Sequence, residues 1–370
     1  MKRIKQRAAA ILVFIAIIYL VYWRIYRKIL NEKSFIPAVA YRAPFTGQLL
    51  IDVEFLKNID NPHFQPISVK IANFTPLSPL SKPSKTPITV IYAGIDDPDL
   101  DYFIFIINDE KYAIRKFEMI SKQFTNIELY IPLYIPKNIS NFLWEFERAR
   151  FIECANIEMR RSPWTWRVIP LSFIESVAKM RDLLIEFRIT PILFTGSLLG
   201  WYRECSIIIH TKDFDFAVLE SEYKNEFLDE LKTSREFDLY WTLGKPSKDF
   251  EMSVYSRGYK IDLFVLYRMA PNMSYFSGLD IENTEKTIFA FPEIKESDVC
   301  TGDLMGRLVF VPCDALNVIK ADVGETWNVD RPSVEYSWNK SPSSVYKVEK
   351  VSEDEANDAV RCYDASGCYR

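Results

Sequence analysis

Two aspartates separated by one residue, Asp213 and Asp215, lie about sixteen residues after a Gly-Ser pair, Gly196-Ser197. This arrangement constrains the fold and the function of the chain more than any other feature. Side chains alternate between faces along a strand, so a strand here directs both carboxylates to one face and the neighbouring phenylalanines to the other. Two carboxylates held together repel each other unless a cation lies between them, and oxygen ligands suit Mg²⁺ or Mn²⁺. The pattern predicts a divalent-metal site next to a strand-to-helix turn whose N–H groups can bind phosphate.

A third carboxylate, Asp262, lies in a segment with the same apolar-acid-apolar pattern and is predicted on a neighbouring strand. Three acids on two adjacent strands can hold cations that neutralise a donor pyrophosphate. A second metal, or one of the aspartates, would take the proton of the acceptor hydroxyl. Asp213, Asp215 and Asp262 are therefore the predicted metal ligands and catalytic residues.

The elements expected around these acids support the same reading. Apolar residues at helical spacing predict a helix over 171–187. The following segments predict strand 191–195, helix 197–203, the carboxylate strand 213–219, and strands 237–242, 251–255 and 259–267. Helix, strand, Gly-Ser turn, helix and acidic strand is an order typical of a nucleotidyltransferase palm.

Proline spacing and hydrophobic periodicity divide the chain into an anchor, a stem and two domains. Six prolines punctuate residues 62–87, and Ser78–Lys85 is typical of a linker. We expect an α/β (α+β) protein whose catalytic domain has a mixed sheet. The expected boundaries are a cytosolic tail 1–7, a transmembrane segment 8–23, a stem 24–87, a membrane-proximal α/β domain 88–155, a nucleotidyltransferase-like catalytic domain 156–350 and an acidic, mobile tail 351–370.

Ala8 to Trp23 are sixteen consecutive residues without a charged side chain, flanked by basic residues on both sides. At about 1.5 Å per residue, a helix over this run spans about 24 Å, which suits the thinner membranes of the early secretory pathway. Its end, Tyr19-Leu-Val-Tyr-Trp23, offers no small-residue cleavage site and places aromatic residues at the interface. We expect a single-pass type II protein of the Golgi or ER membrane, with its catalytic part in the lumen.

All six cysteines lie after the anchor, where disulfides are permitted. Their pairing is open: the pairs closest in sequence are Cys300–Cys313 and Cys362–Cys368, and buried free thiols are the alternative for Cys154 and Cys205. A zinc site is disfavoured, because the chain has two histidines and no C-x₂-C pair. Four sequons predict N-glycosylation in the lumen, at Asn73, Asn138, Asn272 and Asn339.

The charge of the chain is unevenly distributed. Of the 46 Lys and Arg, seven lie in residues 1–28, which leaves 39 basic against 50 acidic residues in the remainder. A nucleic-acid backbone requires clustered positive charge on its partner. The body of this protein is therefore not expected to bind nucleic acid.

Three basic residues flank the aspartate pair: Arg203, His210 and Lys212. Together with the N–H groups of Gly196-Ser197, they are the predicted substrate-binding residues, positioned to contact donor phosphates. Arg203 has an alternative role as an ion-pair partner of Glu204. His210 has an alternative role as a structural hydrogen-bonding residue.

The segment Gly196–Asp215 resembles the signature of the LicD-type transferases of the fukutin family, with the sequence Gly-Ser-Leu-Leu-Gly-Trp-Tyr-Arg-Glu-Cys-Ser-Ile-Ile-Ile-His-Thr-Lys-Asp-Phe-Asp. The likeness covers about residues 165–350. Two positions differ: Ile209 stands where Pro is usual, and Asp322-Val-Gly324 where Tyr-Gly is common. Four further blocks look like those of the family, in the same order: Lys260–Phe264, Val311–Leu316, Gly324–Trp327 and Trp338–Pro342.

This resemblance implies an enzyme of the secretory pathway that transfers a phosphorylated alditol. In the family, ribitol 5-phosphate moves from CDP-ribitol to an O-mannosyl glycan of a glycoprotein, and bacterial relatives transfer phosphocholine from CDP-choline. The implied cofactor is Mg²⁺ or Mn²⁺, bound by Asp213, Asp215 and Asp262. Two alternatives remain: a catalytically idle subunit that positions a partner glycosyltransferase, and a phosphocholine transferase, which would need an aromatic cage for its quaternary amine.

Overall fold

The computed structural model describes residues 47–59, 68–73, 87–93, 97, 99–107, 110–122, 133–159, 161, 169–211, 213–331 and 335–363. All of them belong to one compact unit, Phe45–Arg370. The predicted tail and anchor, residues 1–23, lie outside these ranges, as does Lys212. None of the described helices is long and apolar enough to cross a membrane.

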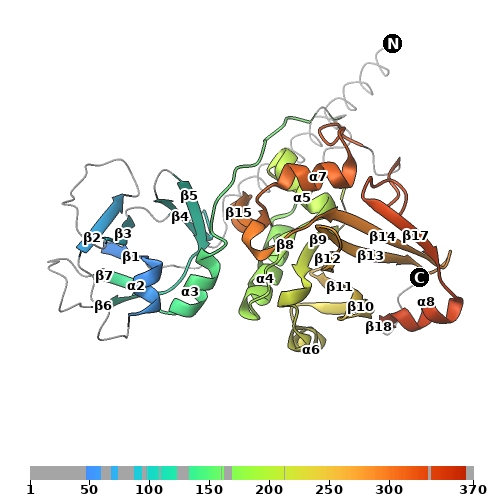
Figure 1. The fold of residues 1–370 in the computed structure, drawn as a ribbon, viewed down its shortest axis with the longest axis horizontal. Helices are drawn as coiled ribbons and strands as arrows, with labels where there is room; N and C mark the ends of the chain where they lie inside the picture. The colour runs from blue at the N-terminus through green and yellow to red at the C-terminus, as the bar shows by residue number, and fades with distance from the viewer. Residues whose placement is uncertain are drawn as a thin grey trace, which may run out of the picture. The chain divides into compact units, whose positions relative to one another are not determined.

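The N-terminal part contains a five-stranded mixed sheet with the order β2-β3-β1-β7-β6. Strands β2 and β3 are parallel, as are β1 and β7, and the other neighbours are antiparallel (Figure 1). Two short helices belong to the same part, α2 (Val53–Lys57) and α3 (Ile139–Phe146). The strands are β1 (Gly47–Leu50), β2 (Ser68–Asn73), β3 (Pro87–Ala93), β6 (Met119–Lys122) and β7 (Leu133–Pro136).

The folded part therefore begins earlier than the sequence predicted. The proposed stem, residues 24–87, includes β1, α2 and β2. Asp52 caps α2 by accepting a hydrogen bond from the Phe55 N–H at 2.8 Å, and Phe55 and Leu56 are buried. Five of the six prolines that suggested a linker fall between these elements in the sequence, and Pro87 is the first residue of β3, a strand position that proline tolerates.

A hairpin of β4 (Tyr102–Ile107) and β5 (Glu110–Arg115) follows. Asp101, which directly precedes β4, is held by two distant partners. Its Oδ2 accepts a hydrogen bond from Arg181 at 2.8 Å, and its Oδ1 accepts one from the Leu308 N–H at 2.8 Å. These partners lie 80 and 207 residues away in the sequence, so no local pattern reveals them.

An eleven-stranded mixed sheet forms the larger, C-terminal part, as the predicted mixed α/β class requires. The main path is β15-β16-β8-β9-β12-β11-β10-β18, and β13, β14 and β17 continue from β12. β9 and β12 are parallel, and so are β16 and β8. The strands are β8 (Ile192–Leu193), β9 (Asp213–Leu219), β10 (Asp238–Lys245), β11 (Lys248–Ser256), β12 (Tyr259–Met269), β13 (Met273–Asp280), β14 (Glu285–Pro292), β15 (Val299–Leu304), β16 (Arg307–Pro312), β17 (Val345–Lys350) and β18 (Val360–Cys362).

The helices of this part follow the predicted order closely. The predicted helix 171–187 is α4, and the predicted helix 197–203 begins two residues earlier, so that Gly196 and Ser197 lie in its first turn. After β9 the chain forms a short 3₁₀ turn, Glu220–Glu222, followed by α6. The helices are α4 (Leu171–Glu186), α5 (Thr195–Glu204), α6 (Asn225–Thr233), α7 (Ala315–Val323) and α8 (Glu353–Ala359).

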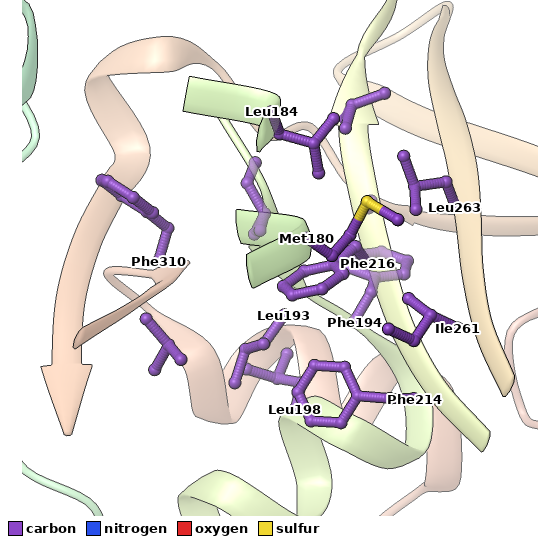
Figure 2. Packing of buried hydrophobic residues seen from close by; sticks show 14 of the residues in the cluster. Met180, Leu184, Leu193, Phe194, Leu198, Phe214, Phe216, Ile261, Leu263 and Phe310 are labelled. Atoms are coloured by element: carbon purple, nitrogen blue, oxygen red, sulfur yellow. The ribbon is translucent and has the colours of Figure 1, made fainter. Parts of the chain in front are cut away.

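The core packs on the face of β9 opposite its aspartates. Phe214 and Phe216 are fully buried, as strand alternation predicted. Phe173 of α4 meets Phe214 edge to face, with ring centroids 6.2 Å apart, so α4 covers this face. Figure 2 shows Met180 and Leu184 of α4 in the same cluster of buried side chains. This packing fixes β9, and its aspartates therefore stand on a rigid strand.

Helix α5 is anchored to β15 through Trp201. This side chain is fully buried, and its Nε1–H donates to the carbonyl oxygen of Asp303 at 2.8 Å. A Cβ atom at Gly302 would overlap the indole ring, so the close approach requires glycine there. The start of α5, with Gly196 and Ser197, is thereby fixed relative to the sheet.

The acidic segment after residue 350, predicted as a mobile tail, forms structure as far as residue 363. Ser352 caps α8 by accepting a hydrogen bond from the Glu355 N–H at 3.2 Å, and Ala356 is buried. β18 then pairs antiparallel with β10. The acidic side chains of α8 face solvent, so an acidic composition is compatible with a docked helix. Residues 364–370 lie outside the described ranges.

Two disulfides are fully described, Cys154–Cys205 and Cys300–Cys313, with Cα atoms 5.5 and 4.9 Å apart. The first excludes the alternative of free thiols at these two positions and ties the segment before α4 to the end of α5. The second joins β15 to the residue that follows β16. Cys362 is also disulfide-bonded.

Candidate active site

The three predicted aspartates lie together on neighbouring parallel strands. Asp213 and Asp215 are on β9, Asp262 is on β12, and Asp262 is the register partner of Asp215. Because β9 and β12 run in parallel and in register, residues at alternate positions on both strands share one face. One carboxylate oxygen from each aspartate lies within 4.8 Å of those of the other two.

This cluster is electrostatically unfavourable when no cation balances it. Burial raises the pKa of Asp215 well above its usual range, and the charges of Asp213 and Asp262 add to the effect. Burial also raises the pKa of Asp262, against the opposing charge of Lys260. The fold therefore holds these carboxyl groups at a cost that a bound cation would relieve.

The hydrogen bonds of the cluster leave ligand positions open. Asp262 Oδ1 is buried and has no hydrogen-bond partner, whereas Oδ2 accepts from Lys260 Nζ at 2.7 Å. Asp213 Oδ1 accepts from the hydroxyl of Thr211 at 3.0 Å. A buried oxygen without a partner costs free energy, and a set of carboxylate oxygens suits a hard divalent cation. The residues present therefore fit Mg²⁺ or Mn²⁺.

The first turn of α5 meets the cluster at Asp215. The hydroxyl of Thr195 donates to Asp215 Oδ2, and the Asp215 N–H donates to Ser197 Oγ at 2.8 Å. Thr195 has φ of +44°, which β-branched residues rarely adopt. Gly196 lies close to the same carboxylate: a Cβ atom at this position would be 3.9 Å from Asp215 Oδ2. The positive end of the α5 dipole is thus placed beside the carboxylates, where an anionic group of a substrate would be favoured.

The flanking basic residues have different surroundings. Arg203 is buried and donates to Glu204 Oε1 and to the carbonyl oxygens of Trp327 and Val329. These contacts favour the structural role considered for Arg203. His210 is half-buried, near Asp330, whose pKa is lowered chiefly by the hydrogen bonds from Arg161. Lys212 lies outside the described residues.

Two charged residues of the site, Lys260 and Glu251, were not predicted from the sequence. Lys260 opens the Lys-Ile-Asp block and lies opposite Asp213 in the β9–β12 register. Glu251 lies on β11, two residues before Ser253, the register partner of Asp262. Strand alternation in the predicted strand 259–267 places Lys260 on the face of Asp262, and that signal would have found it, whereas Glu251 also requires the register of β11 with β12.

Glu251 is a fourth acid on this face and, like Asp262, it is buried, with 8% of its surface exposed. Burial raises its pKa well above the usual range, and the charge of Asp262 adds to the shift. Four buried polar side-chain atoms of the described residues have no hydrogen-bond partner, and two of them, Ser253 Oγ and Asp262 Oδ1, belong to register partners on β11 and β12.

The predicted glycosylation asparagines differ in accessibility. Asn138 and Asn272 are exposed, although the Asn138 side chain also caps α3. Asn339 is half-buried, and its side-chain amide donates to Asp280 Oδ2 at 3.3 Å. Asn73 ends strand β2. Asn138 and Asn272 are therefore the better placed acceptors.

Comparison with known proteins places the site within a recognised domain. Residues 188–314, which hold all three aspartates, match the model described as LicD/FKTN/FKRP, nucleotidyltransferase domain. The Caenorhabditis elegans protein W02B3.4 is 29% identical over 324 residues, covering 83% of this chain and 79% of that protein.

Ribitol-5-phosphate transferase FKTN of Homo sapiens is 28% identical over 224 residues, and that of Mus musculus is 27% identical over 228 residues. Each alignment covers 58% of this chain and 47% of the FKTN protein, so the chain matches about half the length of these relatives. The predicted resemblance is confirmed: over 58% of its length this chain is similar to ribitol-5-phosphate transferase FKTN, and its residues 188–314 match the model of the LicD/FKTN/FKRP nucleotidyltransferase domain.

Proposed function

We propose that this protein is a metal-dependent phosphotransferase that moves a phosphorylated alditol, such as ribitol 5-phosphate, from a CDP-activated donor to a glycan of a glycoprotein. The family match and the FKTN relatives support a transferase of this class. The observation that carries the proposal is the cluster of Asp213, Asp215 and Asp262 with its buried, unpartnered oxygen.

The residues of the site have different proposed roles. Asp213, Asp215 and Asp262 would hold the divalent cation, and Thr195 and Ser197 orient Asp215 through their hydrogen bonds. When bound, the cation supplies charge neutralisation of the donor diphosphate and of the transition state. The N-terminus of α5 favours the phosphate groups on the same side.

We further propose that the catalytic part acts in the lumen of the Golgi or ER, on a type II anchor at residues 8–23. The disulfides Cys154–Cys205 and Cys300–Cys313 suit an oxidising compartment. Peptide-N-glycosidase is expected to increase the gel mobility of the cell-made protein, because Asn138 and Asn272 are exposed sequon asparagines. An unchanged mobility, with Asn138→Gln and Asn272→Gln variants running like the wild type, would contradict the lumenal assignment.

A donor screen tests the proposed reaction. Full-length protein would be melted with Mn²⁺ or Mg²⁺ in the presence of CDP-ribitol, CDP-glycerol or CDP-choline, and the Asp213→Asn/Asp215→Asn variant serves as control. We expect one CDP-alditol to raise the melting temperature only with metal, and only in the wild type. A response to CDP-choline alone would favour a phosphocholine transferase. No response to any donor would contradict the proposal and favour a subunit that positions a partner glycosyltransferase.

A further inference from the structure

The aspartate face carries an excess of negative charge with a single described cation in contact with it. Asp213, Asp215, Asp262 and Glu251 lie on this face, and Lys260 forms the ion pair with Asp262. The basic residues expected to bind phosphate do not supply a second described cation at the cluster. Arg203 is enclosed in its own ion-pair network, and Lys212 lies outside the described residues.

Lys260 is placed by the strand register and not by a flexible loop. It lies opposite Asp213 on β9 and two residues before Asp262, so all three side chains leave the same face of the sheet. Its Nζ is 2.7 Å from Asp262 Oδ2 and 5.7 Å from the centre of the Trp241 ring. About a quarter of the side chain, 27%, remains exposed, so the ammonium group is within reach of a ligand that enters from solvent.

The ion pair with Lys260 uses an oxygen that belongs to the candidate metal site. A cation bound by the three aspartates would share the negative charge of Asp262 with the ammonium group and weaken its hold on Lys260. The freed ammonium has three donors on a flexible stem, which suits a phosphate oxygen as partner. Its counter-ion would then change from Asp262 to the substrate.

We propose that Lys260 is the phosphate-binding residue of this site: it neutralises Asp262 in the metal-free protein and contacts the diphosphate of a nucleotide-activated donor once a divalent cation is bound. The proposal rests on the proposed function for the identity of the donor. Its first half, competition between Lys260 and the metal, is independent of any donor. The two halves predict effects of opposite sign when Lys260 loses its charge.

The test compares full-length wild type with Lys260→Met and Lys260→Arg, and with Lys248→Met as the matched control. Lys248 is an exposed lysine at the start of the neighbouring strand β11. Mn²⁺ binding without nucleotide would be followed by the electron paramagnetic resonance signal of free Mn²⁺. CDP-ribitol binding at saturating Mn²⁺ would be followed by calorimetry. Melting in EDTA confirms that each variant is folded, and Lys260→Arg retains the charge should Lys260→Met be unstable.

We expect Lys260→Met to bind Mn²⁺ about threefold to tenfold more tightly, since a competing charge is gone. The same variant should bind CDP-ribitol about 10- to 100-fold more weakly, the range for a hydrogen bond to a charged group. Lys260→Arg should retain most donor affinity, and Lys248→Met should change neither constant.

A merely structural lysine would weaken both affinities together or leave both unchanged, and either result overturns the proposal. If the wild type binds CDP-ribitol and Lys260→Met binds it equally well, the role of Lys260 fails while the proposed function stands. If the wild type binds Mn²⁺ but no CDP-linked donor, the proposed function fails. The Mn²⁺ comparison then still decides whether Lys260 competes for the site.

Discussion

Asp215→Asn is expected to lower the rate of alditol-phosphate transfer by about 10³-fold or more, because a bound metal contributes several kcal/mol to the transition state. The amide removes one ligand charge from the cluster but keeps its size and its hydrogen bonds to Thr195 and Ser197 feasible. The variant should therefore fold. Transfer would be measured with CDP-alditol and a glycan acceptor, and Asp229→Asn on the exposed surface of α6 serves as control.

The same substitution should make the metal-free protein more stable at neutral pH. Burial and the neighbouring charges raise the pKa of Asp215 in the folded protein above its ordinary value of 3.8. The folded state therefore binds more protons than the unfolded state between these two pKa values. The stability contribution of Asp215 is fully present below pH 3.8 and is lost as the pH rises through the folded pKa.

Urea unfolding in EDTA across pH 4 to 8 tests the direction of this pH dependence of stability. The free energy of unfolding of the wild type should fall relative to that of Asp215→Asn as the pH rises, and Mg²⁺ should restore the wild type alone. Equal pH slopes for the two proteins would show that Asp215 is not held under electrostatic stress. Unchanged transfer by the variant would remove Asp215 from the mechanism.

Glu222→Gln is expected to destabilise the protein by about 3 kcal/mol, because it leaves a buried arginine without its main counter-ion. Glu222 lies just after β9, and its carboxylate accepts from Arg148 at 2.9 Å. It also accepts from the Thr190 N–H at 2.8 Å and the Thr190 hydroxyl at 2.9 Å. Both charged side chains are less than a tenth exposed, so water cannot replace the lost charge.

Glu220→Gln is the matched control, since Glu220 belongs to the same 3₁₀ turn and is exposed. Its expected effect is within about 0.5 kcal/mol. Chemical denaturation at pH 7 would measure both variants. Equal stabilities would mean that Arg148 finds sufficient compensation in Glu296, whose carboxylate is 3.4 Å away and more than half exposed.

The aspartate cluster could be predicted because its determinants are local. The period of two along β9 and β12 sets the side on which Asp213, Asp215 and Asp262 lie, and the apolar residues between them must be buried. Only the pairing of β9 with β12 is long-range, and the shared apolar-acid-apolar pattern predicted it. Glu251 follows from the same rule but required the register of β11.

The role of Arg203 could not be read from local sequence beyond its neighbour Glu204. Its carbonyl partners Trp327 and Val329 are more than 120 residues away. The docking of the C-terminal segment could not be predicted for the same reason, because β18 pairs with β10, a strand that is distant in the sequence. Composition alone suggested a mobile tail, because burial of the single residue Ala356 leaves no periodic signal.

Diffraction from crystals of the full-length protein grown with Mn²⁺ and CDP would show directly whether the three aspartates bind metal and donor. We expect an anomalous manganese peak bounded by oxygens of Asp213, Asp215 and Asp262, with the CDP phosphates on the same side as the start of α5. The peak should vanish in Asp213→Asn/Asp215→Asn. Manganese bound elsewhere, or CDP bound without manganese at these aspartates, would contradict the assignment of this cluster as the active site.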